Sequence, residues 1–451
     1  MSKRFLYVFV FIILSASSIA QTPLVGTFAT DTVLLSSLSP YLISSSISIT
    51  SGATFDVEPG TIIYLDNSMS IIVNNGTLNL NGGINDSIQL INNNTQWSRI
   101  SGQDANINIS YCVFKNASQI LSANNGEVRI DNSRFDSITG GDAVAIHYSD
   151  TVIVHNCNFE GVKNTAKIDC IDCDGISYGL FYNNRFTNWN DDAIDIGVSA
   201  TNIIICNNYF ENCDYAVSLG ESSVAEIYRN LMIRNKGGLQ SHTGAIMTAY
   251  NNTIYNAIFG IQCFHGGTAN TGGTAYLRNI IFSKSKYADF QVQTSSLLEI
   301  TYSSSDIDTL QGTGNIFGYP QFVDTLNNDF HLLAGSICID SGDPADPLDT
   351  NGNFIDIGAF EYYDTTTVYN EVFKNIDINL YPNPTVGIFI IKGHDIKSIE
   401  IIDITGKPLK NIQCCHNLEG FKIDLSNNPK GIYFIRLAKE DCVIFKKVIL
   451  N

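Results

Sequence analysis

An acidic stretch near the middle of the chain holds the residues whose types and spacing best suit chemistry. The segment Asn190-Asp191-Asp192-Ala193-Ile194-Asp195 carries three carboxylates, and Asp169 precedes it by one sequence repeat. Carboxylate oxygens bind calcium, and a paired acid and base can transfer protons to and from a substrate. Aspartate side chains also accept hydrogen bonds from backbone N–H groups in turns, which is a purely structural use. The sequence leaves these three uses open.

Alternation of apolar and polar residues orients the carboxylates. Successive residues of a strand point to opposite faces. Aligning the segments 143–146, 167–170, 193–196, 216–219 and 260–263 directs one column inward, formed by Val144, Ile168, Ile194, Val217 and Ile261. The outward column is then Ala145, Asp169, Asp195, Ser218 and Gln262. In this alignment Asp169 and Asp195 lie on neighbouring strands, about 4.8 Å apart. Carboxylates this close share a proton or bind a cation.

Two overlapping sets of candidate residues follow. The catalytic candidates are Asp169, Asp191, Asp192 and Asp195. The candidate metal ligands are Asp169, Asp195 and Asp214, with calcium as the expected ion because it prefers oxygen ligands. Three more aspartates flank the same segments and complete a predicted carboxylate-lined groove, namely Asp142, Asp172 and Asp174.

A repeated Asn-rich phrase predicts the elements that position these side chains. It occurs at 110–114, 131–135, 155–159, 182–186 and 206–210, and in weaker form at 228–232, 250–254 and 277–281. A repeat of about 24 residues is typical of a solenoid. The segments between the phrases are short, alternating and β-branched, which favours strands over helices. We therefore expect an all-β chain built from coils of a parallel β-helix, whose core closes when the coils stack.

The repeat also assigns structural roles. Five phenylalanines end the clearest phrases and are expected to stack inside the coils, namely Phe114, Phe135, Phe159, Phe186 and Phe210. The position two residues earlier holds Asn184, Asn208, Asn230, Asn252 and Asn279 in the later coils, and these predict a hydrogen-bonded amide ladder. Cys112 and Cys157 occupy the same position in earlier coils and are expected to be small buried core residues.

Composition restricts the partners. The 451 residues carry a net charge of −18, which makes nucleic acid or an anionic membrane an unfavourable partner. Residues 1–20 have Lys3 and Arg4 before a short apolar run, the pattern of a secretory signal peptide. No later stretch is apolar and long enough to predict a membrane span in the mature chain.

Three parts of the chain resemble known families. Residues 41–100, with SGATFDVEPGTIIYL, IIVNNGTLNL and Trp97, resemble the first coils of secreted right-handed β-helix proteins of the pectate-lyase-like superfamily. Residues 291–361, with PQFVD, DFHL, GSICIDSGDP and DIGAFEY, resemble the C-terminal cap of bacterial β-helix proteins. Residues 375–451, with LYPNP, GIFII, IIDITGK and KGIYFIRL, are similar to the type A C-terminal sorting domain of type IX secretion.

These resemblances define the expected organisation. It is a signal peptide at 1–20, a right-handed parallel β-helix at 21–290, a cap at 291–361, a linker at 362–374 and a small β-sandwich sorting domain at 375–451. A sorting domain implies recognition by the type IX machinery, passage through the periplasm, and release or attachment at the outer cell surface.

The Asp-rich stretch is similar to those of β-helix polysaccharide lyases and polygalacturonases. In such families these residues bind calcium or act as acid and base on a uronate polymer. A lyase also needs a base, for which Lys163, Lys167, Arg185 and Arg234 are the nearby candidates. Two functions stay open. One is a non-catalytic, glycan-binding or adhesive surface protein, and the other is a calcium-dependent polysaccharide lyase or glycoside hydrolase.

Overall fold

The protein divides into two compact units, Met1–Tyr362 and Tyr363–Asn451. The computed structural model describes residues 21–163, 167–266, 271–363 and, within the second unit, 379–393, 396, 398–403, 408–413, 418–426, 428–438 and 443–451. The predicted signal peptide and residues 364–374 of the predicted linker lie outside the described residues.

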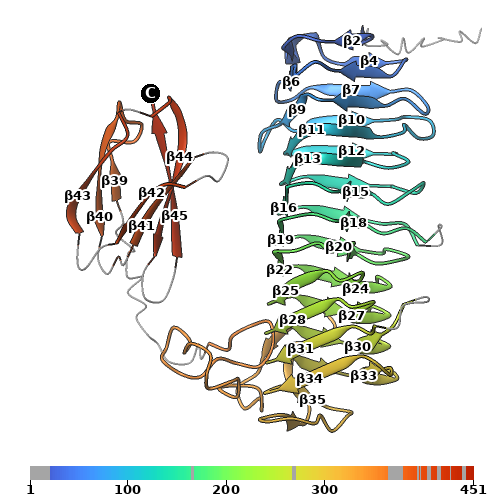
Figure 1. Cartoon of the computed structure of the whole chain (residues 1–451), viewed down its shortest axis with the longest axis vertical. Helices are drawn as coiled ribbons and strands as arrows, with labels where there is room; N and C mark the ends of the chain where they lie inside the picture. The colour runs from blue at the N-terminus through green and yellow to red at the C-terminus, as the bar shows by residue number, and fades with distance from the viewer. Residues whose placement is uncertain are drawn as a thin grey trace, which may run out of the picture. The chain divides into compact units, whose positions relative to one another are not determined.

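The first unit is a parallel β-helix, whose coils are stacked one after another (Figure 1). One face is sheet A, with 14 parallel strands: β1 (Thr22–Pro23), β4 (Tyr41–Ile43), β7 (Ile62–Leu65), β10 (Ile88–Ile91), β12 (Cys112–Lys115), β14 (Arg134–Asp136), β17 (Asn158–Glu160), β20 (Arg185–Thr187), β23 (Tyr209–Glu211), β26 (Leu231–Ile233), β29 (Thr253–Tyr255), β32 (Ile281–Ser283), β35 (Ser304–Ser305) and β36 (Ile316–Phe317).

Two further ladders of parallel strands complete the coils, and the long strands β11 (Ile100–Ser110) and β13 (Leu121–Asp131) belong to both. We call the ladder that contains the acidic segments the groove ladder and the other one the back ladder. The groove ladder contains β2 (Thr27–Phe28), β5 (Ile47–Ile49), β8 (Ile71–Asn74), β15 (Val144–His147), β18 (Ile171–Asp174), β21 (Ile194–Gly197), β24 (Tyr215–Leu219), β27 (Gly237–His242), β30 (Phe259–Phe264) and β33 (Ala288–Val292). The back ladder contains β3 (Thr32–Leu34), β6 (Thr54–Val57), β9 (Thr77–Asn81), β16 (Thr151–His155), β19 (Gly179–Tyr182), β22 (Ile203–Cys206), β25 (Val224–Tyr228), β28 (Ile246–Tyr250), β31 (Thr274–Arg278) and β34 (Leu297–Thr301). A short 3-10 helix, η1 (Ser36–Leu38), lies in the first coils.

The Asn-rich phrases form the turns that enter sheet A. In YNNRF and CNNYF the first asparagine, Asn183 or Asn207, has φ near +55°, a left-handed conformation that asparagine tolerates well. The second asparagine is buried. Asn184 Nδ2 donates to Asn208 Oδ1 at 3.1 Å, and Asn208 Nδ2 donates to Asn230 Oδ1 at 3.1 Å. The predicted amide ladder is confirmed from Asn184 to Asn252. Asn279, its last predicted member, instead donates from Nδ2 to Asp346 Oδ2 at 2.8 Å.

The phenylalanine column is also confirmed. The rings of Phe114, Phe135, Phe159, Phe186 and Phe210 are fully buried and stacked, with centroids 4.4 to 5.1 Å apart in successive coils. Stacked rings at each step fill the core between sheet A and the two other ladders. Cys112 and Cys157 are buried free thiols, as expected.

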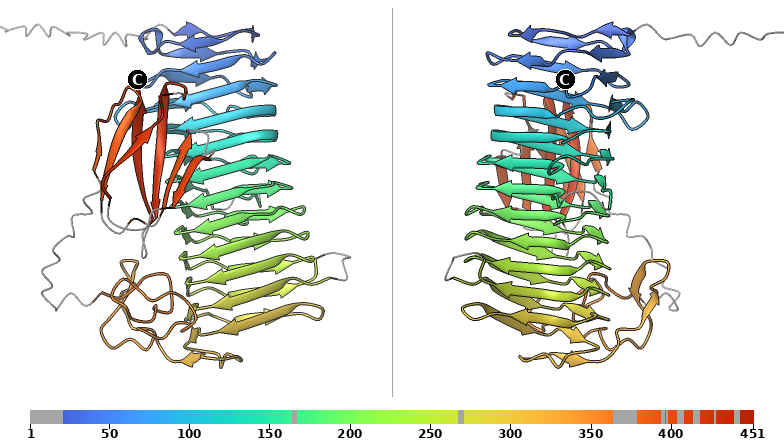
Figure 2. Two further views of the ribbon diagram at one scale, coloured as in Figure 1. Left: turned by 60° about the vertical axis from the view of Figure 1, so that its left-hand side comes forward. Right: turned by 90° about the vertical axis from the view of Figure 1, so that its right-hand side faces the viewer.

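The coils continue beyond the predicted boundary at residue 290. β33, β34, β35 and β36 still pair in parallel with the preceding coil. The cap begins after them and includes the hairpin β37 (Phe322–Asp324) and β38 (Asp329–Leu332). The cap lies beside the last coils (Figure 2). It packs against the outer side of sheet A, where Phe322 and Phe330 contact Tyr255. The apolar side chains that sheet A exposes there explain the location of the cap.

The second unit is a small β-sandwich. One antiparallel sheet has the order β39 (Asn379–Tyr381), β40 (Ile388–Gly393), β43 (Leu418–Asp424), and the other has β42 (Pro408–Gln413), β41 (Ser398–Asp403), β44 (Gly431–Ala438), β45 (Val443–Leu450). Phe389 from one sheet and Ile401 and Ile435 from the other share one core. In the described part of either unit, no helix is long and apolar enough to cross a membrane.

Candidate functional site

The register of the groove ladder corrects the predicted alignment of the aspartates. β18 begins at Ile171, so that Asp172, rather than Asp169, pairs with Asp195 on β21. The sequence contains Ile-Asp-Cys twice, at 168–170 and 171–173, and both copies fit a strand with alternating burial. The first copy lies in the turn before the strand. Ile168 is therefore not the inward neighbour of Ile194, although it is buried.

Asp169 belongs to a column of turn aspartates beside this strand. The backbone N–H of Asp169 donates to Asp142 Oδ1 at 2.9 Å. The N–H of Asp192 donates to Asp169 Oδ1 at 2.8 Å, and the N–H of Tyr215 donates to Asp192 Oδ1 at 3.2 Å. Each carboxylate thus holds the turn of the next coil. These hydrogen bonds give the aspartates a structural role, and each bond uses the Oδ1 atom.

Three of the predicted catalytic residues converge. Asp169, Asp191 and Asp192 each offer a carboxylate oxygen, and these oxygens lie within 4.8 Å of one another. The donor set is all oxygen, which fits calcium rather than a soft metal. Asp195 lies on β21, the strand that directly follows Asp191 and Asp192, and it lines a cavity together with Asp169.

The electrostatics of the group favour a cation. Burial raises the pKa of Asp169 to about 9, and the carboxylates of Asp192 and Asp195 add to the rise. Burial, followed by Asp195 and Asp191, raises the pKa of Asp192 to about 8. The pKa of Asp195 rises to about 6, mainly through burial. A divalent cation would stabilise these buried anions against each other.

Asp214, the third predicted metal ligand, is instead an ion-pair partner. Its Oδ2 lies 3.3 Å from Lys167 Nζ and 3.2 Å from Lys236 Nζ. Lys167 also approaches Asp191 Oδ1 at 3.5 Å. Because two ammonium groups already compensate Asp214, its oxygens are poorly disposed to hold a further cation. Asp214 is not in the group of carboxylates that converge among the described residues, and its ion pairs position the two lysines. Its assignment as a metal ligand stays a prediction.

A cavity of about 340 Å³ adjoins the carboxylates. Its lining is almost entirely polar and comes from successive coils of the groove ladder: Lys167, Asp191, Asp192, Tyr215, Lys236, Gln240, Gln262, Phe264 and Gln293. The Tyr215 hydroxyl donates to Gln262 Oε1. Such a polar hollow along the coils suits a hydrated polymer better than an apolar ligand.

Only one of the four predicted cationic candidates lines this cavity. That residue is Lys167. Lys163 Nζ donates to the Trp189 carbonyl at 2.6 Å, and Arg185 and Arg234 bind Glu211 at sheet A. Sequence reasoning missed Tyr215 and Lys236, which line this cavity, and Glu221 and His242, which line the cavity of Asp169 and Asp195. It also missed His147, whose Nδ1 lies 3.4 Å from Asp174 Oδ2. Their shared signal is an outward or turn position in the groove ladder, which becomes visible only with the correct register.

Two family matches cover separate parts of the chain. Residues 142–307 match the family described as Right handed beta helix region, and residues 379–451 match the family described as Secretion system C-terminal sorting domain. No curated protein matches the chain.

Among solved structures, the chain is similar to the pectate lyase Pel9A, with 16% identity and a TM-score of 0.37 over 72% of this chain and 97% of that chain. It is also similar to the periplasmic alginate epimerase AlgG, with 12% identity and a TM-score of 0.31 over 59% of this chain and 76% of that chain. Likeness at this level bears on neither substrate nor activity.

Proposed function

We propose that this right-handed parallel β-helix protein, which its sorting domain directs through type IX secretion to the cell surface or the medium, is a calcium-dependent polysaccharide lyase. The observation that carries the proposal is the convergence of Asp169, Asp191 and Asp192 beside a cavity lined by two lysines. The substrate class is a uronate-containing polymer, because a cation held by carboxylates can bridge to a carboxylate of the chain.

The cation has one chemical task. Bound to Asp169, Asp191 and Asp192, calcium would neutralise the uronate carboxylate and make the proton on the neighbouring carbon more acidic. Lys167 has a different part. Its pKa is raised, chiefly by Asp191 and by a hydrogen bond to Asp214, so it stays charged and can bind an anionic group of the polymer.

Lys236 is the best-placed base, and it would act as the neutral amine after releasing one proton to solvent. It has a single carboxylate partner, Asp214, and its ammonium lies 5.3 Å from the centre of the Tyr215 ring. In β-elimination the base takes the proton from the carbon bearing the carboxylate. A carbon–carbon double bond then forms, and the bond to the glycosidic oxygen breaks. The departing oxygen would take its proton from water in the open cavity. Burial raises the pKa of Tyr215 to about 12, so its hydroxyl stays protonated and neutral beside the polymer.

A second candidate function is non-catalytic glycan binding at the same groove. The hydrogen bonds from backbone N–H groups to Asp169 and Asp192 favour it, since they give these residues a role that needs no reaction. The paired lysines also suit simple retention of an anionic polymer.

The deciding experiment incubates the mature chain with a panel of uronate polymers, with calcium or with chelator. Ultraviolet absorbance detects the unsaturated ends that only a lyase makes, and a reducing-end assay detects any cleavage. Lys236→Ala should lower the lyase rate by about 10²-fold or more, as loss of a catalytic base does. Asp192→Asn should remove the effect of calcium on the lyase rate, because the substitution deletes a calcium ligand. Lys115→Ala, an exposed lysine on sheet A, is the matched control and should change nothing.

Each outcome assigns the function. Calcium-dependent unsaturated ends would support the lyase. New reducing ends without absorbance would identify a hydrolase. Polymer binding with no new ends of either kind would overturn the lyase and leave glycan binding.

A further inference from the structure

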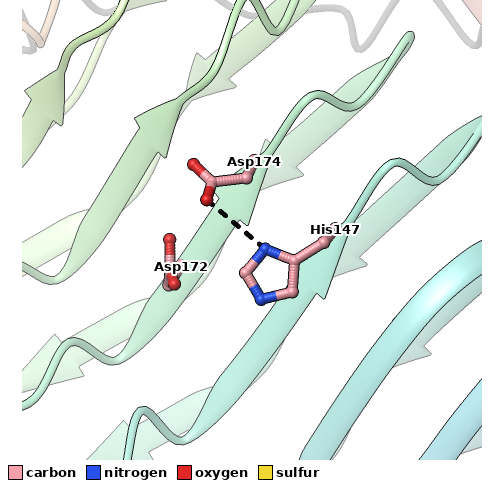
Figure 3. A group of neighbouring side chains, drawn as sticks. All are labelled: His147, Asp172 and Asp174. Carbon is pink, nitrogen blue, oxygen red and sulfur yellow. Dashed lines mark ion pairs between the residues drawn. The ribbon is translucent and has the colours of Figure 1, made fainter.

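A second group of possible ligands lies in the same ladder, one coil nearer the N-terminus. His147 ends β15, and Asp172 and Asp174 project from β18 (Figure 3). One nitrogen of His147 and one oxygen of each carboxylate lie within 4.8 Å of one another. Residues of this group differ from the calcium candidates, and they combine an imidazole with two carboxylates.

Strand register brings the three side chains together. His147 is the direct neighbour of Asp174, and His147 Nδ1 lies 3.4 Å from Asp174 Oδ2. Asp172 pairs with Ala145, whose small side chain leaves space beside the carboxylate. Outward residues at alternate positions of adjacent strands point the same way. The fold therefore directs one nitrogen and two oxygens into one volume.

The Asp172 carboxylate lacks a partner. Within the described residues, Asp172 makes no side-chain hydrogen bond and no ion pair, although it is only partly exposed. Burial, followed by the charges of Asp174 and Asp195, raises its pKa to about 7. A carboxylate without protein donors in such surroundings is the kind of group that a metal ion satisfies.

The space next to this group is kept open. Asp172 and Asp174 line a cavity of about 240 Å³ that they share with Asp169 and Asp195, and Glu221 and His242 line it as well. Gly197 and Gly220 also line this cavity. A Cβ at Gly197 would stand 2.5 Å from Asp174 Oδ1, and a Cβ at Gly220 would overlap the His242 ring. Without a side chain at these two glycines, the Asp174 carboxylate and the His242 ring keep their positions beside the cavity, which the carboxylates of Asp172 and Asp174 line.

We propose that His147, Asp172 and Asp174 form a transition-metal site, for which Zn²⁺ is the best probe, separate from the calcium site of Asp169, Asp191 and Asp192. Imidazole nitrogen suits zinc and its neighbours in the first transition row, whereas calcium binds oxygen. Three protein ligands leave a coordination position for water or a polymer oxygen, as in open zinc sites. The inference does not rest on the proposed lyase activity.

The test measures Zn²⁺ binding by calorimetry on the mature, tag-free chain. Asp192→Asn serves as background so that the calcium site does not contribute. We expect one Zn²⁺ per chain, a Co²⁺ absorption spectrum that includes a nitrogen ligand, and a rise in Tm with Zn²⁺. His147→Ala should weaken Zn²⁺ binding by about 100-fold or more, as the loss of a ligand does. The same substitution in the unaltered chain should leave Ca²⁺ binding unchanged.

His331→Ala is the matched control. His331 Nδ1 lies 2.7 Å from Asp329 Oδ1, but this exposed pair belongs to the cap. It should not alter Zn²⁺ binding. His147→Gln is the alternative should His147→Ala lower Tm without metal. Zn²⁺ affinity that is equal with and without His147, or absent below about 0.1 mM (above roughly −5.5 kcal/mol), would overturn the site. A loss of lyase activity without a loss of Zn²⁺ binding would not overturn the zinc site.

Discussion

At the scale of single residues, the aspartates of the groove have a structural role that is compatible with the proposed role as metal ligands. Asp169 Oδ1 receives the N–H of Asp192, which fixes the turn of the next coil. The second oxygen of Asp169 is left for other partners. A hydrogen bond to one oxygen also restricts the rotamer, which pre-orders the carboxylate for a cation. Turn capping and cation binding are therefore compatible, whereas the sequence presented them as alternatives.

The carboxylates should make the metal-free protein less stable as pH rises. Their folded pKa values, about 6 for Asp195, 8 for Asp192 and 9 for Asp169, exceed the ordinary value of 3.8. The folded state thus binds more protons than the unfolded state above pH 3.8. This contribution is complete below that pH and is lost as pH rises through 6 to 9. Thermal melts with chelator should show Tm falling across this window.

Calcium should remove most of this decline, since it stabilises the charged form. Melts at pH 8 with and without calcium provide the measurement. A Tm that is independent of pH from 5 to 9 in chelator would contradict the coupling of the carboxylates.

Replacing one of these acids by its amide should stabilise the metal-free chain, unlike an ordinary core substitution. Asp169→Asn keeps an oxygen that can accept the N–H of Asp192 but removes a group that must bind a proton to stay buried at pH 8. We expect the metal-free chain at pH 8 to gain about 1 to 3 kcal/mol of unfolding free energy and to lose calcium affinity. Denaturant titration measures the first and calorimetry the second. Asp150→Asn, at an exposed position, is the control and should change neither.

At the scale of elements, period and residue type were sufficient for the columns that point inward. The Phe column and the Asn ladder follow from one residue type at one position of each repeat, so a shift of a few residues between coils does not hide them. The register of the outward-facing residues is harder to predict from the sequence. Ile168-Asp169-Cys170 and Ile171-Asp172-Cys173 are equally good strands in isolation, and only pairing with β15 and β21 selects the second. The position of the cap against sheet A depends on contacts distant in sequence.

The amide ladder should carry a large share of coil stability. Asn208 Oδ1 accepts the N–H of Asn184 at 2.9 Å, and Asn208 Nδ2 donates to the Phe181 carbonyl at 2.9 Å. Asn208→Ala leaves both groups buried without partners. The expected loss is about 2 to 6 kcal/mol, from about one to three for each of the two unsatisfied groups. Denaturant unfolding measures it. Asn106→Ala, on an exposed position of β11, should cost less than about 0.5 kcal/mol. Equal costs would show that the ladder adds no stability.

At the scale of the whole molecule, the chain separates the solenoid that carries the candidate site from an export signal. The two units have separate apolar cores, one inside the coils and one inside the β-sandwich. A long solenoid gains stability from contacts between neighbouring coils, so it does not need the sandwich to fold. The sorting domain can therefore be recognised by the secretion machinery without disturbing the groove, and the groove can keep its geometry if the sandwich is removed.

This separation predicts the effect of truncation. A chain that ends at residue 363 retains the whole β-helix and its cap, and loses the residues that match the sorting domain. In a host with type IX secretion we expect it to accumulate in the periplasm, while the complete chain reaches the surface or the medium. Cell fractionation measures the location. Purified, the truncated chain should keep the Tm of the solenoid transition and bind calcium as before, because every groove residue lies within the first unit. Surface delivery of the truncated chain, or a fall of several degrees in that Tm, would show that the units depend on each other.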